Sequence, residues 1–330
     1  TLMSSKVALL RERHLSNSEV VCYNTGPDYE LVAIGAKGQS PSIDIPVRLL
    51  YSSATVPGSV LGDAARAVES LLLGSSTYMY GLVDELAEFD LVHTIETFQG
   101  FSEQAIEAKQ KHGCNVVCTV FENIPYFAES NHYSRTWRES LKHRNADSIK
   151  QTVREGADAF IAMSDRAKTA LEIEGVPSED IHVIPLGVDV DRFKPGIVDN
   201  EVELPGTLDD DSTLHVVYVG RYTWEKGVFD LLSTWKQVCD TVNEDVTLTM
   251  VGWGPDKGQA EAFARHAEIP NVEICGPVDY EQMPCVYDAA DLTVVPSLPS
   301  RFWQEQYGRV VVESQACGTP VLASRTGGIP

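Results

Sequence analysis

The stretch V-V-Y-V-G-R-Y-T-W-E-K-G, residues 216–227, decides the fold of the second half of the chain. An apolar run ends at Gly220-Arg221, a short turn follows, and Lys226 precedes a helical segment. A buried strand, a turn and a helix make up the repeating unit of a parallel α/β sheet. Loops beyond the carboxyl ends of such strands line ligand crevices, and two cations five residues apart can converge there on one diphosphate. The plainer alternative is a surface arginine and a lysine at the start of a helix.

The same alternation of short apolar runs and helical segments extends in both directions from this stretch. In the second half it predicts strands at 214–219, 246–251, 272–274, 292–295 and 321–323, and helices at 228–242, 259–266, 283–289 and 309–317. In the first half it predicts strands at 6–10, 31–34, 90–94, 115–121, 159–163 and 181–185, with helices at 60–73, 101–112 and 165–174. We therefore predict an α/β protein with two Rossmann-like, doubly wound domains.

The domain organisation follows from length and from one polar segment. A chain of 330 residues is long enough for two domains. Residues 196–212 are acidic and contain Gly and Pro, so we predict a linker there between a first domain at 1–195 and a second at 213–330. The sequence stops at residues 327–330, directly after a predicted strand, and we expect the second domain to be incomplete.

Composition excludes several classes of protein. With 43% hydrophobic and 22% charged residues, the chain has the composition of a globular protein. The net charge of −22 disfavours nucleic acid as a partner and suggests adaptation to concentrated salt. No apolar run is long enough to cross a bilayer, so we expect a cytoplasmic protein. The seven cysteines include no C-x-x-C pair and are expected to be reduced.

A second motif, E-Q-Y-G-R-V-V-V-E, is expected to bind an anion. Gly308 lets the backbone approach an anion closely. The N–H groups of Tyr307, Gly308 and Arg309 point out of the start of the predicted helix, where the helix dipole favours phosphate.

Two glutamates, Glu305 and Glu313, bracket this motif. Glu313 lies one turn into the predicted helix, where its carboxylate can accept hydrogen bonds from vicinal hydroxyls such as a ribose diol. Glu305 precedes the helix and would face the other end of the ligand, where sugar hydroxyls need an acceptor. The alternative is a loop glutamate and a solvated helix glutamate, which any acidic protein could supply.

These segments together resemble family 4 retaining glycosyltransferases of the GT-B fold. In the second half, the segments that carry the resemblance are G-R-Y-T-W-E-K-G (220–227), V-G-W-G-P (251–255), A-D-L-T-V-V-P-S (290–297), the glutamate pair and A-C-G-T-P-V-L-A-S-R-T-G-G-I-P (316–330). In the first half they are I-A-M-S-D-R-A-K (161–168) and I-H-V-I-P-L-G-V-D-V-D-R-F-K-P (181–195). The resemblance covers most of the chain.

The resemblance implies roles for individual residues. Arg221 and Lys226 would bind the diphosphate of a nucleotide-sugar donor, Glu313 its ribose, and Glu305 the transferred sugar. The donor-binding set would also include Gly220, Tyr307, Gly308 and Arg309. No metal and no cofactor is expected, because two cations and a helix start stabilise the leaving diphosphate. A D-x-D metal site at Asp209–Asp211 is rejected, since that run lies in the predicted linker and not at a strand end.

The first half departs from the family pattern. The family often has a histidine after the strand written V-V-C-T-V-F, where this chain has Glu122, and we interpret Glu122 as a functional replacement. His93, at the end of a predicted strand, occupies a position like that of a common cleft histidine, although a buried or capping imidazole is equally consistent. The glycine-rich turn that the family often has after its first strand is missing.

One basic segment interrupts the acidic trend. Arg135, Arg138 and Lys142 would share a face of a helix that begins after Ser134. We hypothesise that this face contacts anionic lipid headgroups or the phosphate of a lipid-linked acceptor, as a peripheral contact on the cytosolic membrane face. The alternative is a solvated helix that packs Trp137 inward.

The sequence therefore predicts a transferase that moves a hexose-type sugar from a nucleoside diphosphate to a glycan or lipid-linked acceptor. One alternative is a GT-B-fold sugar-nucleotide epimerase, which would need no acceptor. The other is a non-catalytic subunit that binds a sugar nucleotide, which Glu122 and the missing glycine turn favour.

Overall fold

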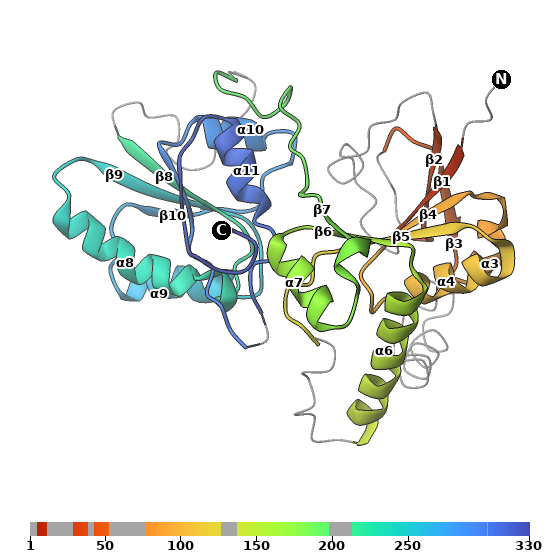
Figure 1. Ribbon diagram of the computed structural model, residues 1–330. Helices are drawn as coiled ribbons and strands as arrows, with labels where there is room; N and C mark the ends of the chain where they lie inside the picture. Colours follow the sequence, from red (N-terminus) through yellow and green to blue (C-terminus); the bar gives the residue numbers. More distant parts are fainter. Residues whose placement is uncertain are drawn as a thin grey trace. The chain divides into compact units, whose positions relative to one another are not determined.

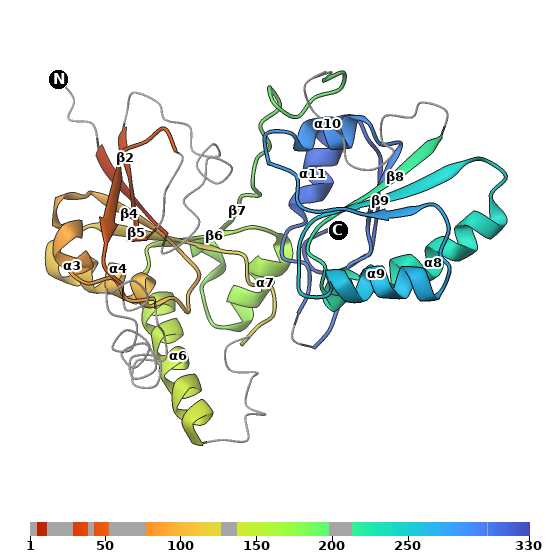
Figure 2. The same cartoon turned by 180° about the vertical axis from the view of Figure 1, so that it is seen from behind.

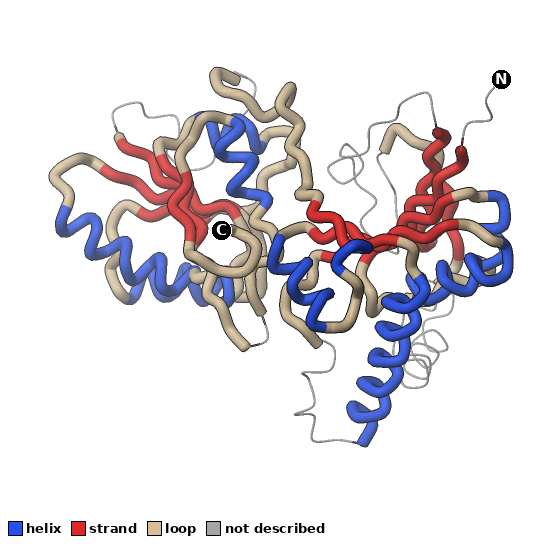
Figure 3. Tube along the Cα trace, in the orientation of Figure 1, coloured by secondary structure: helices blue, strands red, loops and turns tan. Residues whose placement is uncertain are grey.

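The computed structural model describes residues 5–11, 29–38, 43–52, 77–126, 137–197, 213–301 and 303–330. The chain divides into two compact units, Thr1–Pro185 and Leu186–Pro330 (Figure 1). Each unit is built on its own parallel β-sheet, which Figure 3 shows in red and Figure 2 shows from behind. The prediction of two α/β parallel-sheet domains is confirmed.

The first unit has a seven-stranded parallel sheet within its described residues, in the order β3-β2-β1-β4-β5-β6-β7. The strands are β1 (Ser5–Leu10), β2 (Tyr29–Ala36), β3 (Val47–Leu50), β4 (Leu91–Ile95), β5 (Asn115–Val120), β6 (Ala159–Ala162) and β7 (Ile181–Val183). The strand order runs outward from β1 to β3 and then resumes at β4 on the other side of β1. The carboxyl ends of β1 and β4 therefore form the point where the winding direction switches.

Helices complete the first unit. Among its described residues they are α3 (Leu82–Glu85), α4 (Gly100–His112), α6 (Trp137–Gly156) and α7 (Asp165–Ile173), with 3₁₀ turns at Leu86–Glu88 and Ser178–Asp180. Helix α4 ends at Gly113, which has a φ of 85° and donates its N–H to the Lys109 carbonyl. Ser164 caps α7 by accepting the N–H of Ala167.

The part of the second unit that the structure describes has a five-stranded parallel sheet in the order β10-β9-β8-β11-β12. Its strands are β8 (Leu214–Val219), β9 (Val246–Val251), β10 (Val272–Ile274), β11 (Leu292–Val295) and β12 (Val321–Ala323). Its helices are α8 (Val228–Thr241), α9 (Lys257–His266), α10 (Met283–Asp288) and α11 (Arg309–Ala316), with a 3₁₀ turn at Trp224–Lys226. Helices α8 and α9 cover one face of this sheet, and α10 and α11 cover the other (Figure 1).

Alternation along β8 explains these two layers. Tyr218 packs in one apolar cluster with Leu232 of α8, and Val217 packs in the other with Val286 of α10. Successive side chains of a strand point to opposite faces, so the apolar run at residues 216–219 of β8 belongs at the centre of a sheet covered on both sides.

Most element bounds agree with the sequence prediction to within two or three residues. Strand β3, helix α3 and the 3₁₀ turns at Leu86–Glu88, Ser178–Asp180 and Trp224–Lys226 were not predicted, because each is four residues or fewer and has no periodicity to detect. The predicted helix at 60–73 lies outside the described residues. The second compact unit includes residues 186–195, which we had assigned to the first domain; Phe193 is 1% exposed within an apolar cluster of the second unit.

None of the helices in the described ranges is long and apolar enough to cross a lipid bilayer.

Candidate functional site

The loops that follow β8 and β9 lie against each other at the carboxyl edge of the second sheet. Gly252 has a φ of 152°, and a Cβ built there would lie 1.8 Å from the carbonyl oxygen of Gly220. Only glycine fits this close approach. The Tyr218 hydroxyl donates to the Arg221 carbonyl at 2.7 Å and fixes the turn that carries the arginine.

A cavity of about 310 Å³ opens beyond these strand ends. Its walls come from four segments: the β8 loop, the β9 loop, the segment from Pro277 into α10, and the start of α11. The lining residues are Val219, Gly220, Arg221, Val251, Gly252, Trp253, Pro277, Val278, Tyr280, Met283, Tyr287, Arg309, Val310 and Glu313. Four residues predicted from the sequence to bind the donor line it together: Gly220, Arg221, Arg309 and Glu313.

Glu313 is a buried acceptor in the wall of this cavity. The residue is 4% exposed, and its two carboxylate oxygens each accept a tyrosine hydroxyl at 3.0 Å, from Tyr280 and Tyr287. The Arg309 Nε lies 3.6 Å from the Glu313 Oε1. Burial raises the pKa of Glu313, while the Arg309 charge and the two tyrosine hydroxyls lower it. Glu313 is therefore held rigidly at the cavity and is not a solvated helix residue.

Lys226 and Glu305 form an ion pair with each other. The Lys226 Nζ lies 2.7 Å from the Glu305 Oε2, and the Ser297 hydroxyl donates to the same oxygen at 2.7 Å. Glu305 is 8% exposed, and the Lys226 ammonium lies 5.1 Å from the centre of the Trp303 ring. This pair joins the β8 loop to the loop that precedes α11.

Arg221 lines the cavity from the turn that the Tyr218 hydroxyl fixes. Burial is the main cause that raises the pKa of Tyr218; Tyr222 and the Glu305 charge raise it further, and the Arg221 charge lowers it. Arg221 is half exposed, and its nearest carboxylate is the Glu225 Oε1 at 3.7 Å. Its guanidinium is thus available to an anion.

The start of α11 has the expected glycine. Gly308 precedes the helix with a φ of 81°. The Tyr307 hydroxyl donates to the carbonyl of Leu186 at 2.5 Å, which ties the loop to the first residue of the second unit. Tyr307 and Gly308 do not line the cavity described above, although the next residue, Arg309, does.

In the first unit, His93 lies in β4 and is 9% exposed. Its Nε2 is 2.6 Å from the Thr119 hydroxyl oxygen. Burial, and then the positive charge of Arg11, lower the pKa of His93 to about 3, so the imidazole is neutral at ordinary pH.

Glu122 follows β5 and binds its own loop. Its Oε1 accepts the N–H groups of Asn123 at 2.9 Å and Ile124 at 2.8 Å. Burial is the main cause that raises the pKa of Glu122. The replacement of a family histidine by Glu122 stays a prediction.

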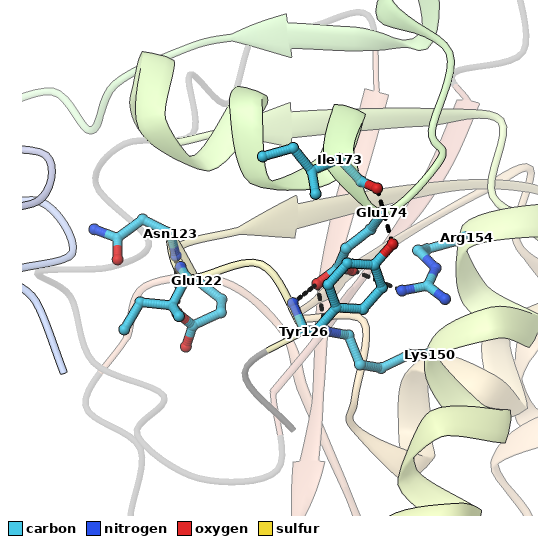
Figure 4. A network of polar contacts seen from close by, with 8 residues as sticks. Glu122, Asn123, Tyr126, Lys150, Arg154, Ile173 and Glu174 are labelled. Carbon is cyan, nitrogen blue, oxygen red and sulfur yellow. Dashed lines mark hydrogen bonds and ion pairs between the residues drawn. The ribbon is translucent and has the colours of Figure 1, made fainter. Parts of the chain in front are cut away.

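The loop that carries Glu122 is anchored by a buried polar network (Figure 4). Glu174 accepts the Tyr126 N–H at 2.7 Å, the Lys150 ammonium at 2.6 Å and the Arg154 guanidinium at 2.8 Å. The Tyr126 hydroxyl donates to the Ile173 carbonyl at 2.9 Å. The loop from β5 is therefore fixed to α6 and to the end of α7.

Two segments of the chain match known protein families. Residues 202–330 match the family described as glycosyl transferases group 1, and residues 40–192 match the one described as glycosyltransferase family 4. HepE from Anabaena, solved with UDP and glucose, superposes with a TM-score of 0.65 at 19% identity, covering 98% of this chain and 82% of HepE. Sucrose-phosphate synthase from Thermosynechococcus elongatus also gives 0.65, at 20% identity and with the same coverage.

Two segments of this chain thus match glycosyltransferase family models, and the chain has the GT-B fold.

Curated relatives of these GT-B domains share one printed name. A D-inositol 3-phosphate glycosyltransferase from Catenulispora acidiphila is 33% identical over 185 residues, which is 53% of this chain and 42% of that protein. The enzyme of the same name from Corynebacterium jeikeium is 33% identical over 195 residues, or 54% of this chain and 44% of that protein. The chain thus spans less than half the length of these two relatives.

Three residues of the GT-B site were not found by sequence reasoning. Tyr280 and Tyr287, which hold Glu313, come from the segment around α10, and Trp253 comes from the β9 loop. The motif V-G-W-G-P had drawn attention to that loop without assigning its tryptophan a role. A tyrosine gives no sign in the sequence of a distant partner, so only the fold could pair Tyr280 and Tyr287 with α11.

Only part of the basic segment lies within the described residues. Arg135 and Asp209–Asp211 lie outside the described residues. Arg138 and Lys142 belong to the long helix α6, and the acceptor or membrane contact of these cations stays a prediction.

Proposed function

We propose that this chain carries the two domains of a retaining, metal-independent glycosyltransferase. It moves a hexose-type sugar from a nucleoside-diphosphate sugar to a glycan or lipid-linked acceptor. The observation that supports this most strongly is Glu313, a carboxylate buried in the cavity wall and oriented by two tyrosine hydroxyls beside Arg309. A fixed acceptor of this kind suits the vicinal hydroxyls of a ribose.

The cations suit the diphosphate. Arg221 lines the same cavity with a half-exposed guanidinium, and a guanidinium can bind phosphate through two parallel hydrogen bonds. Lys226 supplies a second cation from the same loop. When the bond between the sugar and the phosphate breaks, negative charge develops on the departing diphosphate, and these two cations stabilise it.

Glu305 suits the transferred sugar. Its carboxylate is paired with Lys226 and Ser297, which hold it in place. Sugar hydroxyls can donate to its oxygens, while the Lys226 ammonium moves to the diphosphate. The pair thus keeps two opposite charges oriented until the donor binds.

The reaction proposed for this site retains the anomeric configuration. The acceptor hydroxyl oxygen bonds to the anomeric carbon on the face from which the diphosphate leaves. The bond from that carbon to the phosphate oxygen breaks, and the hydroxyl proton passes to the departing phosphate. Since arginine and lysine charges neutralise the diphosphate, no divalent metal is required.

UDP-sugars are the proposed donors, because HepE, which shares the fold, was solved with UDP and with UDP-glucose. A thermal-shift screen of UDP, GDP and ADP sugars at high salt tests this choice. The donor that raises the melting temperature of the wild-type chain should no longer do so for Arg221→Ala or for Glu313→Ala. Arg265→Ala and Glu244→Ala change exposed residues outside the cavity and should leave it intact.

A transfer assay completes the test. Release of nucleoside diphosphate that depends on acceptor and is insensitive to EDTA, with a product of the donor's anomeric configuration, is the expected result. Donor binding without transfer to any acceptor would instead favour a non-catalytic sugar-nucleotide-binding protein, and conversion of the donor without acceptor would favour an epimerase.

A further inference from the structure

The first unit contains a buried carboxyl group, that of Glu96, which the donor chemistry does not use. Glu96 directly follows β4, is 7% exposed and has a φ of 59°, in the left-handed region. Its Oε1 accepts the Phe121 N–H at 3.0 Å, and its Oε2 is buried with no hydrogen-bond partner. A strained backbone and an unpaired buried oxygen both cost stability, and such features gather at ligand sites.

A second carboxyl group lies beside it. Strands β4 and β5 are parallel neighbours, with Ile95 opposite Thr119, so Glu96 and Glu122 both emerge at the carboxyl edge of the sheet. Burial, and then the Glu122 charge, raise the pKa of Glu96 to about 8. The N–H groups of the β5 loop and the charge of Lys150 lower this pKa, but by less. Glu96 therefore keeps its proton at neutral pH beside the Glu122 carboxyl, whose own pKa is raised mainly by burial.

The nearby cations are engaged elsewhere. Lys150 and Arg154 both bind Glu174, the anchor of the Glu122 loop (Figure 4). Arg11, at the end of β1, donates its Nη1 to the Leu10 carbonyl at 2.8 Å. Its charge adds to the effect of burial in lowering the pKa of His93, and it opposes the rise that burial and Glu96 cause in the pKa of Cys118. These cations are therefore bound to groups other than the Glu96 and Glu122 carboxyls.

Topology places this pair where a ligand is expected. Glu96 follows the last residue of β4, at the switch point between β1 and β4. Ligands of open α/β sheets bind outside the strand ends at such a point. Two carboxyl groups there, one protonated, offer an O–H donor and carboxylate acceptors. A hydroxyl group is both a donor and an acceptor and matches them, whereas an ionised phosphate offers acceptors and negative charge only.

We propose that Glu96 and Glu122 form a recognition site for an uncharged, hydroxyl-bearing group of the acceptor, and that they exclude a phosphate ester from that position. This deepens the proposed function and rests on it. The recognised acceptor group is thus a sugar or cyclitol that bears no phosphate where it meets these carboxyls. In this respect the chain would differ from its relatives, whose printed names specify inositol 3-phosphate.

Ligand-detected NMR titration at fixed ionic strength tests the proposal with a matched pair of probes, myo-inositol and myo-inositol 3-phosphate, in the presence and absence of UDP. The wild-type chain should bind myo-inositol about tenfold or more tightly than the phosphate, because the ester would place its negative charge beside that of Glu122 in a partly buried site. The variant Glu96→Gln/Glu122→Gln should lose most of this discrimination. Glu107→Gln, an exposed carboxylate of α4, serves as the matched control and should keep it.

Each other outcome has a definite meaning. Equal or tighter binding of the phosphate by the wild type, an unchanged ratio in the double variant, or binding of neither probe overturns the proposal. UDP binding is read on the same samples. A chain that binds UDP but prefers the phosphate loses only this inference, whereas a chain that binds no UDP loses the proposed transferase function. Circular dichroism melting shows whether the variants are folded.

Discussion

Replacing Glu96 by glutamine should make the protein more stable at alkaline pH. The Glu96 carboxyl has a pKa near 8 in the folded chain against 4.5 for a free glutamate. Between these values the native state binds more protons than the unfolded state, so this group's contribution to stability falls as the pH rises from about 4.5 to about 8. At about 1.4 kcal/mol per pKa unit, the contribution of Glu96 to the free energy of unfolding falls by roughly 3–5 kcal/mol over that pH range. Glutamine does not titrate and keeps an oxygen to accept the Phe121 N–H.

The assay is urea-induced unfolding of the wild type and of Glu96→Gln at pH 5 and at pH 8.5. The free energy of unfolding of the variant minus that of the wild type should be small at pH 5 and should increase by a few kcal/mol at pH 8.5. His93 titrates with the opposite sign, since burial lowers its pKa to about 3, but it is present in both proteins and largely cancels in the difference. Glu107→Gln should show no such dependence. A difference that stays constant between the two pH values would refute the buried, protonated state of Glu96.

The second unit gives three further predictions. Tyr287→Phe removes a hydroxyl from the buried Glu313 carboxylate and should lower the free energy of unfolding by about 1.5–3 kcal/mol and weaken UDP binding; a change in neither urea unfolding nor calorimetric titration would contradict this role. Leu232→Ala truncates a fully buried side chain of α8 and should cost about 2–5 kcal/mol in urea unfolding, with a cost below about 1 kcal/mol as the contrary result. Lys226→Met should weaken UDP binding by about tenfold or more, because one charge-assisted hydrogen bond is lost. Glu305→Gln should keep UDP affinity and slow sugar transfer. Equal effects of the two substitutions on UDP affinity would refute this division of roles.

Sequence periodicity was sufficient where elements are long and buried on both sides. Strands β8 and β9 were predicted with their observed bounds, because each is a six-residue run rich in apolar and β-branched residues between turn residues. Strand β3 was not predicted, because V-R-L-L is short and includes a charge. Helix α3 was not predicted, because its four residues make only one turn and show no periodicity.

The candidate site was predictable only in its charged members. Arginine, lysine and glutamate at strand ends and at a helix start indicate anion and hydroxyl binding from their residue types alone. Burial and pairing depend on the fold. The sequence could not show that Glu313 is held by two tyrosines from another segment, nor that Lys226 is paired with Glu305. Glu96 drew no attention, since a single glutamate in T-I-E-T does not reveal an unpaired buried oxygen.

The most direct measurement of the donor site is a double-mutant cycle between Glu313 and the ribose. Calorimetric titration compares UDP with 2′-deoxy-UDP and 3′-deoxy-UDP on the wild type, on Glu313→Ala and on the exposed-site control Glu244→Ala. We predict that loss of a ribose hydroxyl weakens binding to the wild type and to the control by about tenfold or more, and has little further effect once Glu313 is gone. Deoxy nucleotides that bind the wild type as tightly as UDP, or that lose the same affinity in Glu313→Ala, would contradict the assignment of this cavity to a nucleotide-sugar donor.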